Sequence, residues 1–349
     1  MFDHASYDNH EDVHLFHDED SGLRCIIAIH STALGPSAGG TRMWNYMSGA
    51  DMFTDALRLS QGMSYKNAMA GIPHGGGKAV IWGNSKTDKS DRLFEAFGRA
   101  VESLAGRYYT AEDVGIDPED IEIAARQTQY AGGLVSKGEG GSGDPSPVTA
   151  RGVFLGLQAA ADLAFGTSDL SNRTIAVQGV GSVGGYLSHY LAEAGAKLYI
   201  CDMDTDAVQS VAKATGANIV PVDDIYDVDA DIFSPNALGA VLNEQTLPRL
   251  KVKVVAGGAN NQLSTSDMGA KVRDAGILYA PDYVINGGGI INVAGELSGE
   301  YSRDWVEQKV QTMVQTLRSV MEESLAGHEP TNLVADRIAR ARIDAASAS

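Results

Sequence analysis

Two lysines near a run of glycines are the side chains of this sequence best suited to acid–base chemistry. Lys66 follows Met63-Ser-Tyr, and Lys78 follows three consecutive glycines that begin at Gly75. Glycines let the backbone approach a ligand closely and leave the neighbouring amine unobstructed. If both lysines face one pocket, repulsion between their charges and loss of hydration favour proton loss from one of them. The pair then predicts a general base, although each lysine taken alone is more typical of a solvated surface.

A second glycine cluster predicts a binding site for a dinucleotide. Its residues are Gly179, Gly181, Ser182, Val183 and Gly184. The first glycine of such a turn permits a tight bend, the second lets the backbone approach a pyrophosphate, and the third lets helix and strand pack closely. The pyrophosphate then lies on unpaired N–H groups at the positive end of a helix. A glycine turn with a purely structural role is the alternative.

The surroundings of this turn favour the dinucleotide interpretation. Residues 174–178 are typical of a short buried strand, and the segment after the turn is helical. Asp202 ends the next apolar segment, 18 residues after Gly184. Its carboxylate can accept hydrogen bonds from a ribose diol and would repel a 2′-phosphate. The sequence therefore predicts NAD, in preference to NADP, as the cofactor.

Short apolar segments and amphipathic helices must position these residues. Strands are predicted at residues 23–29, 79–82, 174–178, 198–201, 232–233, 253–255 and 277–279. Helices are predicted at residues 51–63, 91–104, 153–164, 306–320 and from about 332 to 343. The alternation after residue 174 predicts a parallel sheet covered by helices. The fold class is therefore α/β.

The length of 349 residues and one glycine-rich segment predict two domains. Residues 131–147 are rich in glycine and include Pro145 and Pro147, a composition typical of a loop or hinge. We therefore predict a substrate domain at residues 1–133, a hinge at 131–147 and a cofactor domain at 145–329. We also expect this hinge to let the domains close.

Composition excludes several classes of function. Asp and Glu number 45 against 27 Lys and Arg, which gives a net charge of −18. So acidic a chain repels nucleic acids and anionic membrane surfaces. No apolar stretch is long enough to span a membrane, and the first twenty residues lack the features of a signal peptide. Cys25 and Cys201 lie in apolar segments and are expected to be reduced core thiols, so we predict a cytoplasmic protein.

Seven motifs, in order, resemble those of the amino-acid dehydrogenases that act on glutamate, leucine, phenylalanine and valine. The resemblance extends from about residue 10 to about residue 343. The motifs are Gly39-Gly-Thr-Arg-Met43, Lys66-Asn, Gly75-Gly-Gly-Lys78, Thr110-Ala-Glu-Asp113-Val-Gly, Pro145-Ser-Pro-Val-Thr149, Gly258-Ala-Asn260-Asn-Gln and Asn286-Gly-Gly-Gly-Ile.

This resemblance implies a fold and an assembly. It implies an N-terminal α/β domain for substrate binding and oligomerisation, a cleft, and a Rossmann domain that binds NAD. It also implies that the last helix, at about residues 330–349, packs back on the first domain. The partners would be a small-molecule substrate and further copies of the chain, a homo-oligomer.

The resemblance also implies roles for individual residues. Lys66 would bind the substrate carboxylate, Lys78 would be the catalytic lysine and Asp113 would relay protons. Asn260 and Asn286 would lie near substrate and nicotinamide. Further implied substrate contacts are Gly39, Gly40 and Met63, and further cofactor contacts are Thr149 and Pro235. The reaction would be reversible oxidative deamination of an L-amino acid to a 2-oxo acid and ammonia.

Two pocket positions bear on the choice of amino acid. Glutamate-specific members carry a lysine where this chain has Ala38, so an apolar substrate is expected. The small Ala38 would deepen the pocket, whereas Ile290, in the motif that ends at Val293, would fill it. We favour leucine and other branched-chain amino acids. An aromatic substrate, phenylalanine or tryptophan, is the alternative.

Other interpretations have less support. A hydroxy-acid dehydrogenase needs a His/acid pair that the motifs do not supply, and a non-catalytic NAD-binding module would be expected to lose Lys78 or Asp113. His10 and His14 match the zinc-protease spacing, but Val13 and Leu15 suggest a strand. On a strand the two histidines would be roughly 13 Å apart, so no metal site is predicted. His74 and Asp144 depart from the family pattern, and their roles stay open.

Overall fold

The computed structural model describes residues 2–134, 143–299 and 301–348. The chain forms two compact units. Unit 1 comprises Met1–Pro145, Ile290–Val306 and Ala339–Ser349, and unit 2 comprises Ser146–Gly289 and Glu307–Ile338. Most of the predicted hinge, residues 135–142, lies outside the described residues.

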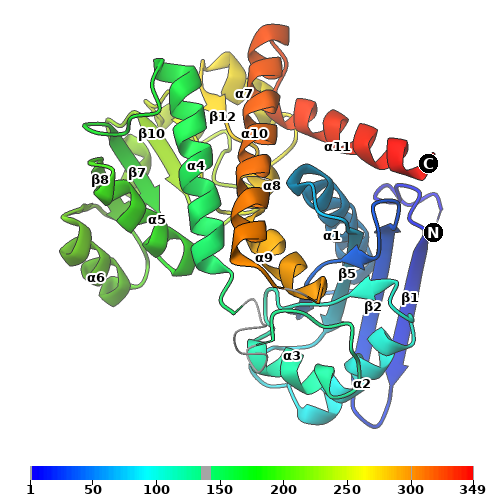
Figure 1. Ribbon diagram of the computed structural model, residues 1–349. Helices are drawn as coiled ribbons and strands as arrows, with labels where there is room; N and C mark the ends of the chain where they lie inside the picture. Colours follow the sequence, from blue (N-terminus) through cyan, green and yellow to red (C-terminus); the bar gives the residue numbers. More distant parts are fainter. Residues whose placement is uncertain (1, 135–142, 300, 349) are drawn as a thin grey trace. The chain divides into compact units, whose positions relative to one another are not determined.

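Unit 1 is built on a mixed sheet with the strand order β1-β2-β5-β3-β6, in which β4 also pairs with β5. Its strands are β1 (Asp12–Asp18), β2 (Leu23–Ser31), β3 (Ser37–Ala38), β4 (Thr41–Trp44), β5 (Gly75–Trp82) and β6 (Tyr108–Tyr109). β2 is antiparallel to both β1 and β5, whereas β3 and β4 run parallel to β5. The antiparallel hairpin β1-β2 forms one edge of the sheet (Figure 1).

Helices cover both faces of this sheet (Figure 1). On one face α1 (Gly49–Ala70) packs over Ile26, Ala28 and Val80. On the other, α2 (Asp91–Glu102) and α3 (Pro118–Ala125) pack over a core that includes Ile27 and Ile81. Because side chains alternate along a strand, Lys78, two residues before Val80, belongs to the face that α1 covers.

Unit 2 is built on a parallel sheet with the order β12-β11-β10-β7-β8-β9. Its strands are β7 (Thr174–Gln178), β8 (Lys197–Cys201), β9 (Asn218–Ile219), β10 (Ile232–Pro235), β11 (Val254–Val255) and β12 (Leu278–Tyr279). From β7 the chain adds β8 and β9 on one side of β7, and then adds β10, β11 and β12 on the other side. This reversal is the strand order of a dinucleotide-binding fold, and it confirms the predicted parallel sheet.

The helices of unit 2 include α4 (Ser146–Phe165), α5 (Ser182–Glu193), α6 (Thr205–Thr215), α7 (Met268–Asp274) and α8 (Asp282–Ile285). Two short 3₁₀ helices, η2 (Val222–Asp227) and η3 (Leu247–Arg249), complete its connections. α4 begins earlier than predicted, because Pro147 is accommodated in a first helical turn, where its missing N–H needs no partner.

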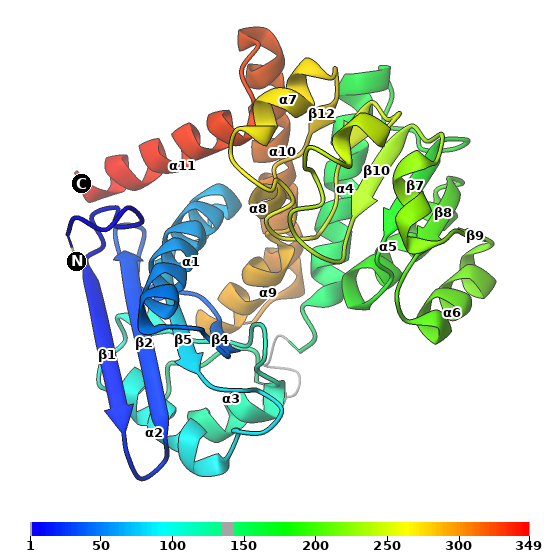
Figure 2. The ribbon, with the colours of Figure 1, turned by 180° about the vertical axis from the view of Figure 1, so that it is seen from behind.

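Three helices near the C-terminus contain the points at which the chain passes between the units: α9 (Gly288–Leu297), α10 (Arg303–Gly327) and α11 (Thr331–Ser347). The end of α11 belongs to unit 1, where the two chain termini lie side by side (Figures 1 and 2). There Arg340 pairs with Asp8 at 2.8 Å, and Arg342 donates to the carbonyl oxygen of Ala68.

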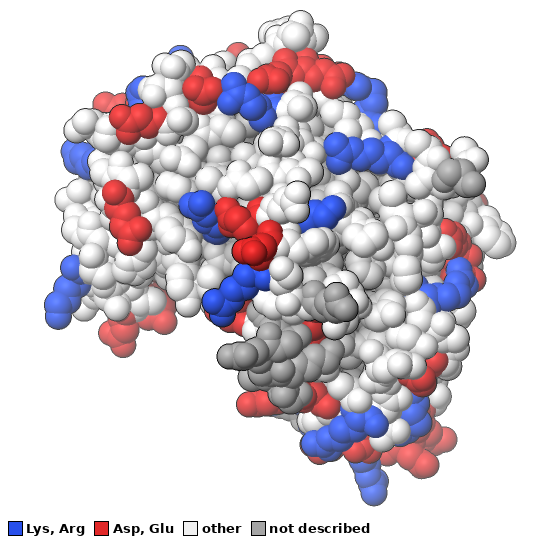
Figure 3. Space-filling model, viewed as in Figure 1, with Lys and Arg blue, Asp and Glu red and all other residues white. Residues whose placement is uncertain are grey.

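Cys25 and Cys201 are both buried free thiols, as predicted. Burial raises the pKa of the Cys201 thiol to about 11. Among the described residues, no helix has the length and apolar character needed to cross a membrane. On the face shown in Figure 3, acidic and basic side chains are interspersed, and neither sign forms a continuous patch.

Candidate functional site

The centre of the candidate site in unit 1 is an ion pair between Lys78 and Asp113. Lys78 lies on β5 and is only 5% exposed, and Asp113 lies in the loop after β6. The Lys78 Nζ and an Asp113 carboxylate oxygen are 2.6 Å apart. Burial opposes ionisation of Asp113, but the charges of Lys78 and Arg42 outweigh it and hold the pKa of this carboxyl below its usual value. A proton can pass directly between these two groups.

Glycines bring the neighbouring segments together around this pair. A Cβ at Gly39 would lie 1.9 Å from the Gly77 carbonyl oxygen, and one at Gly40 would lie 2.9 Å from the Asp113 Cβ. A Cβ at Gly39 would also lie 3.0 Å from the Met63 Cγ. Only glycine therefore lets the chain after β3 pack between β5, α1 and the Asp113 loop. The structure thus groups three predicted substrate contacts, Gly39, Gly40 and Met63, with the strand of Lys78 or with Asp113.

Helix α1 presents Lys66 next to an anchoring residue. The buried Asn67 side chain donates to the carbonyl oxygens of Ala38 and Gly75, at 3.1 Å and 2.6 Å. These bonds fix this turn of α1 against β3 and β5. Lys66 precedes Asn67, is half-buried and lies about one turn after Met63. The anchor therefore positions the two predicted substrate-binding side chains of α1.

Ile290 and Val293 lie on α9, in the part of this helix that belongs to unit 1. Val293 is buried, and a Cβ at Gly132 would lie 3.0 Å from its Cγ1. Glu296, near the end of α9, accepts a hydrogen bond from the backbone N–H of Gly133. This part of α9 therefore packs against Gly132 and Gly133, near the end of the first segment of unit 1 (Met1–Pro145).

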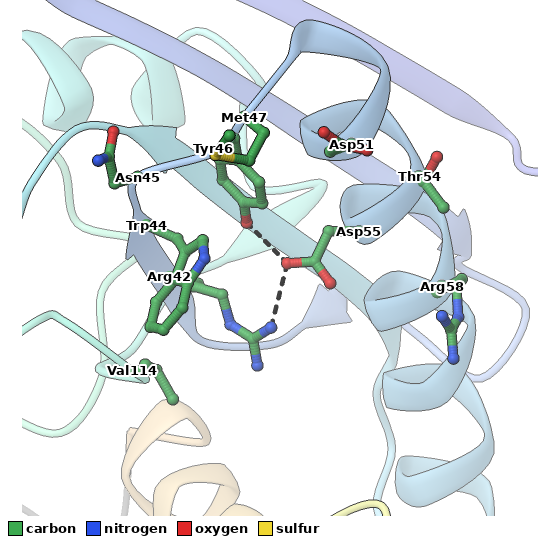
Figure 4. A pocket seen from close by; sticks show the side chains of 10 residues that line it. All are labelled: Arg42, Trp44, Asn45, Tyr46, Met47, Asp51, Thr54, Asp55, Arg58 and Val114. Carbon is green, nitrogen blue, oxygen red and sulfur yellow. Dashed lines mark hydrogen bonds and ion pairs between the residues drawn. The ribbon is translucent and has the colours of Figure 1, made fainter. Parts of the chain in front are cut away.

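Sequence reasoning missed a polar network beside Asp113. Arg42 on β4 lies with its Nε 3.5 Å from the Asp113 carboxylate and its Nη1 3.0 Å from that of Asp55. The Tyr46 hydroxyl donates to the same Asp55 oxygen at 2.7 Å. Arg42, Tyr46 and Asp55 line a cavity of about 510 Å³ (Figure 4). Arg42 falls within one of the seven motifs, but only the strand register shows which carboxylates it contacts.

In unit 2 the glycine turn has the backbone that a dinucleotide needs. Gly179 has a φ of 88°, and a Cβ at Gly184 would lie 2.0 Å from the Gly179 carbonyl oxygen. Gly181 precedes α5, which begins with Ser182 and Val183, and a Cβ on Gly181 would meet no described atom within 4 Å. Asp202 accepts a hydrogen bond from the Val180 N–H at 2.7 Å, and so holds the turn against the end of β8.

A group of asparagines follows the neighbouring strands. The Asn286 Nδ2 donates to the Asn260 Oδ1 at 2.6 Å and to the Gly258 carbonyl oxygen at 3.1 Å. Within the described residues, the buried Asn286 Oδ1 has no hydrogen-bond partner. The Pro235 carbonyl, at the end of β10, accepts from the N–H of Ala259. The loops after β10 and β11 therefore meet at the carboxyl edge of the sheet.

Thr149 comes to the same part of unit 2 from α4. It is buried, and a Cβ at Gly288 would lie 2.9 Å from its Cα, so α4 and the start of α9 are in close contact. The open glycine turn, the start of α5, the Asp202 carboxylate and the unsatisfied Asn286 oxygen together fit a dinucleotide.

The other residues that the sequence analysis considered are His10, His14, His74 and Asp144. His10 lies outside β1, and its buried ring contacts the Leu57 carbonyl oxygen at 3.0 Å. Burial lowers the pKa of His10 to about 4. His14 lies within β1, as the alternation predicts. His74 is also buried, 3.1 Å from the Pro36 carbonyl oxygen, whereas Asp144 is exposed. Among the described residues, no three His, Cys, Asp or Glu side chains are grouped to hold a metal ion.

A parallel sheet with a glycine turn and a separate unit with a buried lysine paired to an aspartate define a two-domain dehydrogenase. Family models agree with this class. Residues 10–130 match the dimerisation domain of the Glu/Leu/Phe/Val dehydrogenases, and residues 200–345 match the Glutamate/Leucine/Phenylalanine/Valine dehydrogenase domain. The chain belongs to this family of amino-acid dehydrogenases.

Individual relatives cover almost the whole chain. A leucine dehydrogenase from Bacillus subtilis (strain 168) is 48% identical over 99% of this chain and 94% of its own. A valine dehydrogenase from Streptomyces coelicolor is 43% identical over 97% of this chain and 94% of its own. The crystal structure of L-tryptophan dehydrogenase from Nostoc punctiforme has a TM-score of 0.85 and 40% identity, and covers 97% of each chain.

Proposed function

We propose that this chain catalyses the reversible NAD-dependent oxidative deamination of a hydrophobic L-amino acid, with leucine and other branched-chain amino acids favoured. The observation that carries the proposal is the pair of the buried Lys78 with the partly buried Asp113, 2.6 Å between nitrogen and oxygen. A pair of this kind supplies both the base and the proton relay that deamination needs.

The groups of unit 1 would bind the substrate and move its protons. Lys66 would bind the substrate carboxylate. Lys78, as a neutral amine, would remove a proton from the substrate ammonium and later one from the water that attacks the iminium carbon. Asp113 would exchange these protons with Lys78, and its negative charge would stabilise the cationic iminium. The products are the 2-oxo acid and ammonia.

The groups of unit 2 would bind the cofactor. When bound, NAD accepts the hydride from the substrate Cα. The backbone N–H groups of the turn from Gly179 to Gly184 would hold its pyrophosphate, and Asp202 would hold the adenosine ribose. The residues near the nicotinamide would be Thr149, Pro235, Asn260 and Asn286. The Asn286 oxygen, which has no partner within the described residues, is suited to accept a hydrogen bond from the carboxamide.

Ala38 supports an apolar substrate side chain. It is 1% exposed and offers no charge to a substrate carboxylate. The curated relatives named leucine dehydrogenase favour a branched-chain substrate, since five of them are 47–48% identical to this chain. The second candidate is an aromatic amino acid. The small Ala38 and the structural likeness to an L-tryptophan dehydrogenase favour it.

The test is NADH formation at alkaline pH, which favours deamination because the reaction releases protons. The panel contains leucine, valine, phenylalanine, tryptophan and glutamate, each assayed with NAD and with NADP. We expect turnover of leucine and valine with NAD and none of glutamate. Faster turnover of an aromatic amino acid would establish the second candidate, and no turnover of any member would contradict the proposal.

We further propose that the chain assembles as a homo-oligomer in the cytoplasm. The match of residues 10–130 to a dimerisation domain supports the assembly, and the two buried free thiols suit a reducing compartment. Light scattering on the purified protein should give a multiple of the chain mass of 36.8 kDa. The mass of a single chain at micromolar concentration would contradict the assembly.

A further inference from the structure

Asp113 lies between two cationic side chains, only one of which the proposed reaction uses. Lys78 donates to an Asp113 oxygen at 2.6 Å, and the Nε of Arg42 lies 3.5 Å from the same oxygen. That Nε is buried and has no hydrogen-bond partner within the described residues. Arg42 therefore acts on Asp113 mainly through its charge, which no proton transfer can remove, since a guanidinium stays protonated in proteins.

The fold holds this guanidinium in place. Arg42 is paired in register with Val80 on the neighbouring strand β5. Since paired residues of adjacent strands share a face, Arg42 lies on the same face of the sheet as Lys78, beneath α1. From α1, Asp55 bonds the Nη1 of Arg42, and the buried Tyr46 hydroxyl bonds Asp55 in turn. Figure 4 shows the Arg42 and Tyr46 side chains approaching the Asp55 carboxylate.

This arrangement has a consequence for proton transfer. An isolated Asp113 carboxylate would hold the proton of Lys78 tightly, which opposes the neutral amine that deamination needs. A fixed positive charge next to the pair offsets part of this attraction. The neighbouring Glu112 adds negative charge near Asp113, and burial raises the pKa of Glu112. Arg42 is thus the cation that balances Asp113 when Lys78 becomes neutral.

We propose that Arg42 is a positioning residue for the reaction: anchored by Asp55 and Tyr46, it fixes the Asp113 carboxylate beside Lys78 and favours release of the proton from this pair. The inference rests on the proposed roles of Lys78 and Asp113. It assigns to the cavity lined by Arg42, Tyr46 and Asp55 the task of holding this charge.

The first test compares Arg42→Gln with Arg58→Gln in the assembled enzyme. Arg58 lines the same cavity but is exposed, which makes it the matched control. Loss of the Arg42 charge should move the acid limb of the kcat/KM profile upward by about one pH unit. We expect kcat at neutral pH to fall about tenfold, with KM for the amino acid changed less than twofold. Arg58→Gln should leave the profile unchanged.

Arg42→Lys separates charge from geometry. A lysine keeps the positive charge but cannot bridge two carboxylates as a planar fork does. The acid limb should therefore stay within about 0.3 pH units of the wild type, while kcat falls several-fold. If Arg42→Gln does not fold, the kcat of Arg42→Lys alone tests the inference. A wild-type kcat in Arg42→Lys, or an unshifted acid limb in folded Arg42→Gln, overturns the inference.

A second measurement does not depend on turnover. Competitive acetylation of Lys78 by acetic anhydride, read by mass spectrometry across pH, reports when this amine loses its proton. The pH of half-maximal labelling should be higher in Arg42→Gln than in the wild type, and unchanged in Arg58→Gln. A wild type that turns over no amino acid would defeat the proposed function, whereas an unchanged labelling profile in Arg42→Gln would defeat this inference separately.

Discussion

The candidate site in unit 1 contains a charged side chain that is withdrawn from water. Lys78 is almost fully buried, and a buried charge is tolerated only when it is paired and hydrogen-bonded. Asp113 supplies the partner, and Arg42 shares it. Each of these three charged side chains therefore has an ionic contact, and only Lys78 is almost fully withdrawn from water. Such a site can move a proton over one short hydrogen bond, because the groups are already in place.

Ala38 offers a direct test of substrate selection. Ala38→Leu adds apolar volume at a buried position next to Gly39, so it should reduce the space for a bulky substrate side chain. We expect kcat/KM for phenylalanine and tryptophan to fall about tenfold or more relative to that for valine. The measurement is the ratio of kcat/KM values across the amino-acid panel. A parallel loss for all substrates would show that Ala38 does not select among side chains.

The sequence motifs predicted Lys78 and Asp113 as site residues, but not their contact with each other or the residues beside them. Asp55 lies 13 residues after Arg42 and on another element. Nothing in residue spacing shows that β4 pairs with β5 in the register that places Arg42 beneath α1. Long-range ion pairs of this kind depend on sheet register, which local patterns do not fix where strands are short.

In the glycine turn of unit 2, which joins β7 to α5, Gly184 and Gly181 have different surroundings. A Cβ at Gly184 would collide with the Gly179 carbonyl oxygen at 2.0 Å, so this glycine serves the packing of α5 on β7. A Cβ at Gly181 would lie in open space, and the φ of Gly181 is −66°, which any residue adopts. Gly181 is therefore dispensable for the fold and matters only for what binds there.

This difference predicts opposite outcomes for two alanine substitutions. Gly181→Ala should leave the thermal midpoint unchanged and weaken NAD binding at least tenfold, because the methyl group occupies space that the pyrophosphate needs. Gly184→Ala should lower both stability and NAD affinity. Differential scanning fluorimetry and NADH fluorescence titration measure the two quantities. Wild-type NAD affinity in Gly181→Ala would contradict the assigned cofactor site.

Apolar patterns predicted most of the longer elements and the short strands β11 and β12, but not three short strands of unit 1. β3 and β6 have two residues each and β4 has four, too few for any alternation to be detected. Glycine has low strand propensity, so the sequence predicts this strand only from Ala79. In the structure, β5 begins at Gly75. Pairing with β2 and β3 on its two sides holds this glycine segment extended. Tertiary pairing thus overrides local preference at the segment that leads into Lys78.

Over the whole molecule, the ends of the chain meet in unit 1. Asp8 accepts hydrogen bonds from Arg340 of α11 and from Gln61 of α1, at 2.8 Å and 2.7 Å. It also contacts the buried His30 ring at 3.3 Å. Burial raises the pKa of Asp8, but these bonds outweigh it and the net shift is downward. One carboxylate therefore ties the first residues and the last helix to the helix that carries Lys66.

Asp8→Asn should lower the free energy of unfolding by about 1 kcal/mol at pH 7, a modest value because Arg340 is half exposed. A carboxyl whose pKa is lowered in the folded state stabilises it above the unfolded pKa, and that stabilisation is lost as the pH falls. The difference between wild type and variant should therefore shrink as the pH falls below about 4, the ordinary pKa of an aspartate. Denaturant unfolding at several pH values measures it, with the exposed Asp20→Asn as control. A difference that does not depend on pH would contradict this account.

The most direct test of the central claim is the turnover of Lys78→Ala with leucine and NAD, measured beside NAD binding by the same preparation. Loss of the base should reduce kcat by at least about a hundredfold, while the NAD dissociation constant stays within twofold, because the proposed cofactor residues lie in unit 2. Lys86→Ala, an exposed lysine in the loop after β5, is the matched control and should behave as the wild type. Wild-type turnover in Lys78→Ala would contradict the assignment of Lys78 as the base.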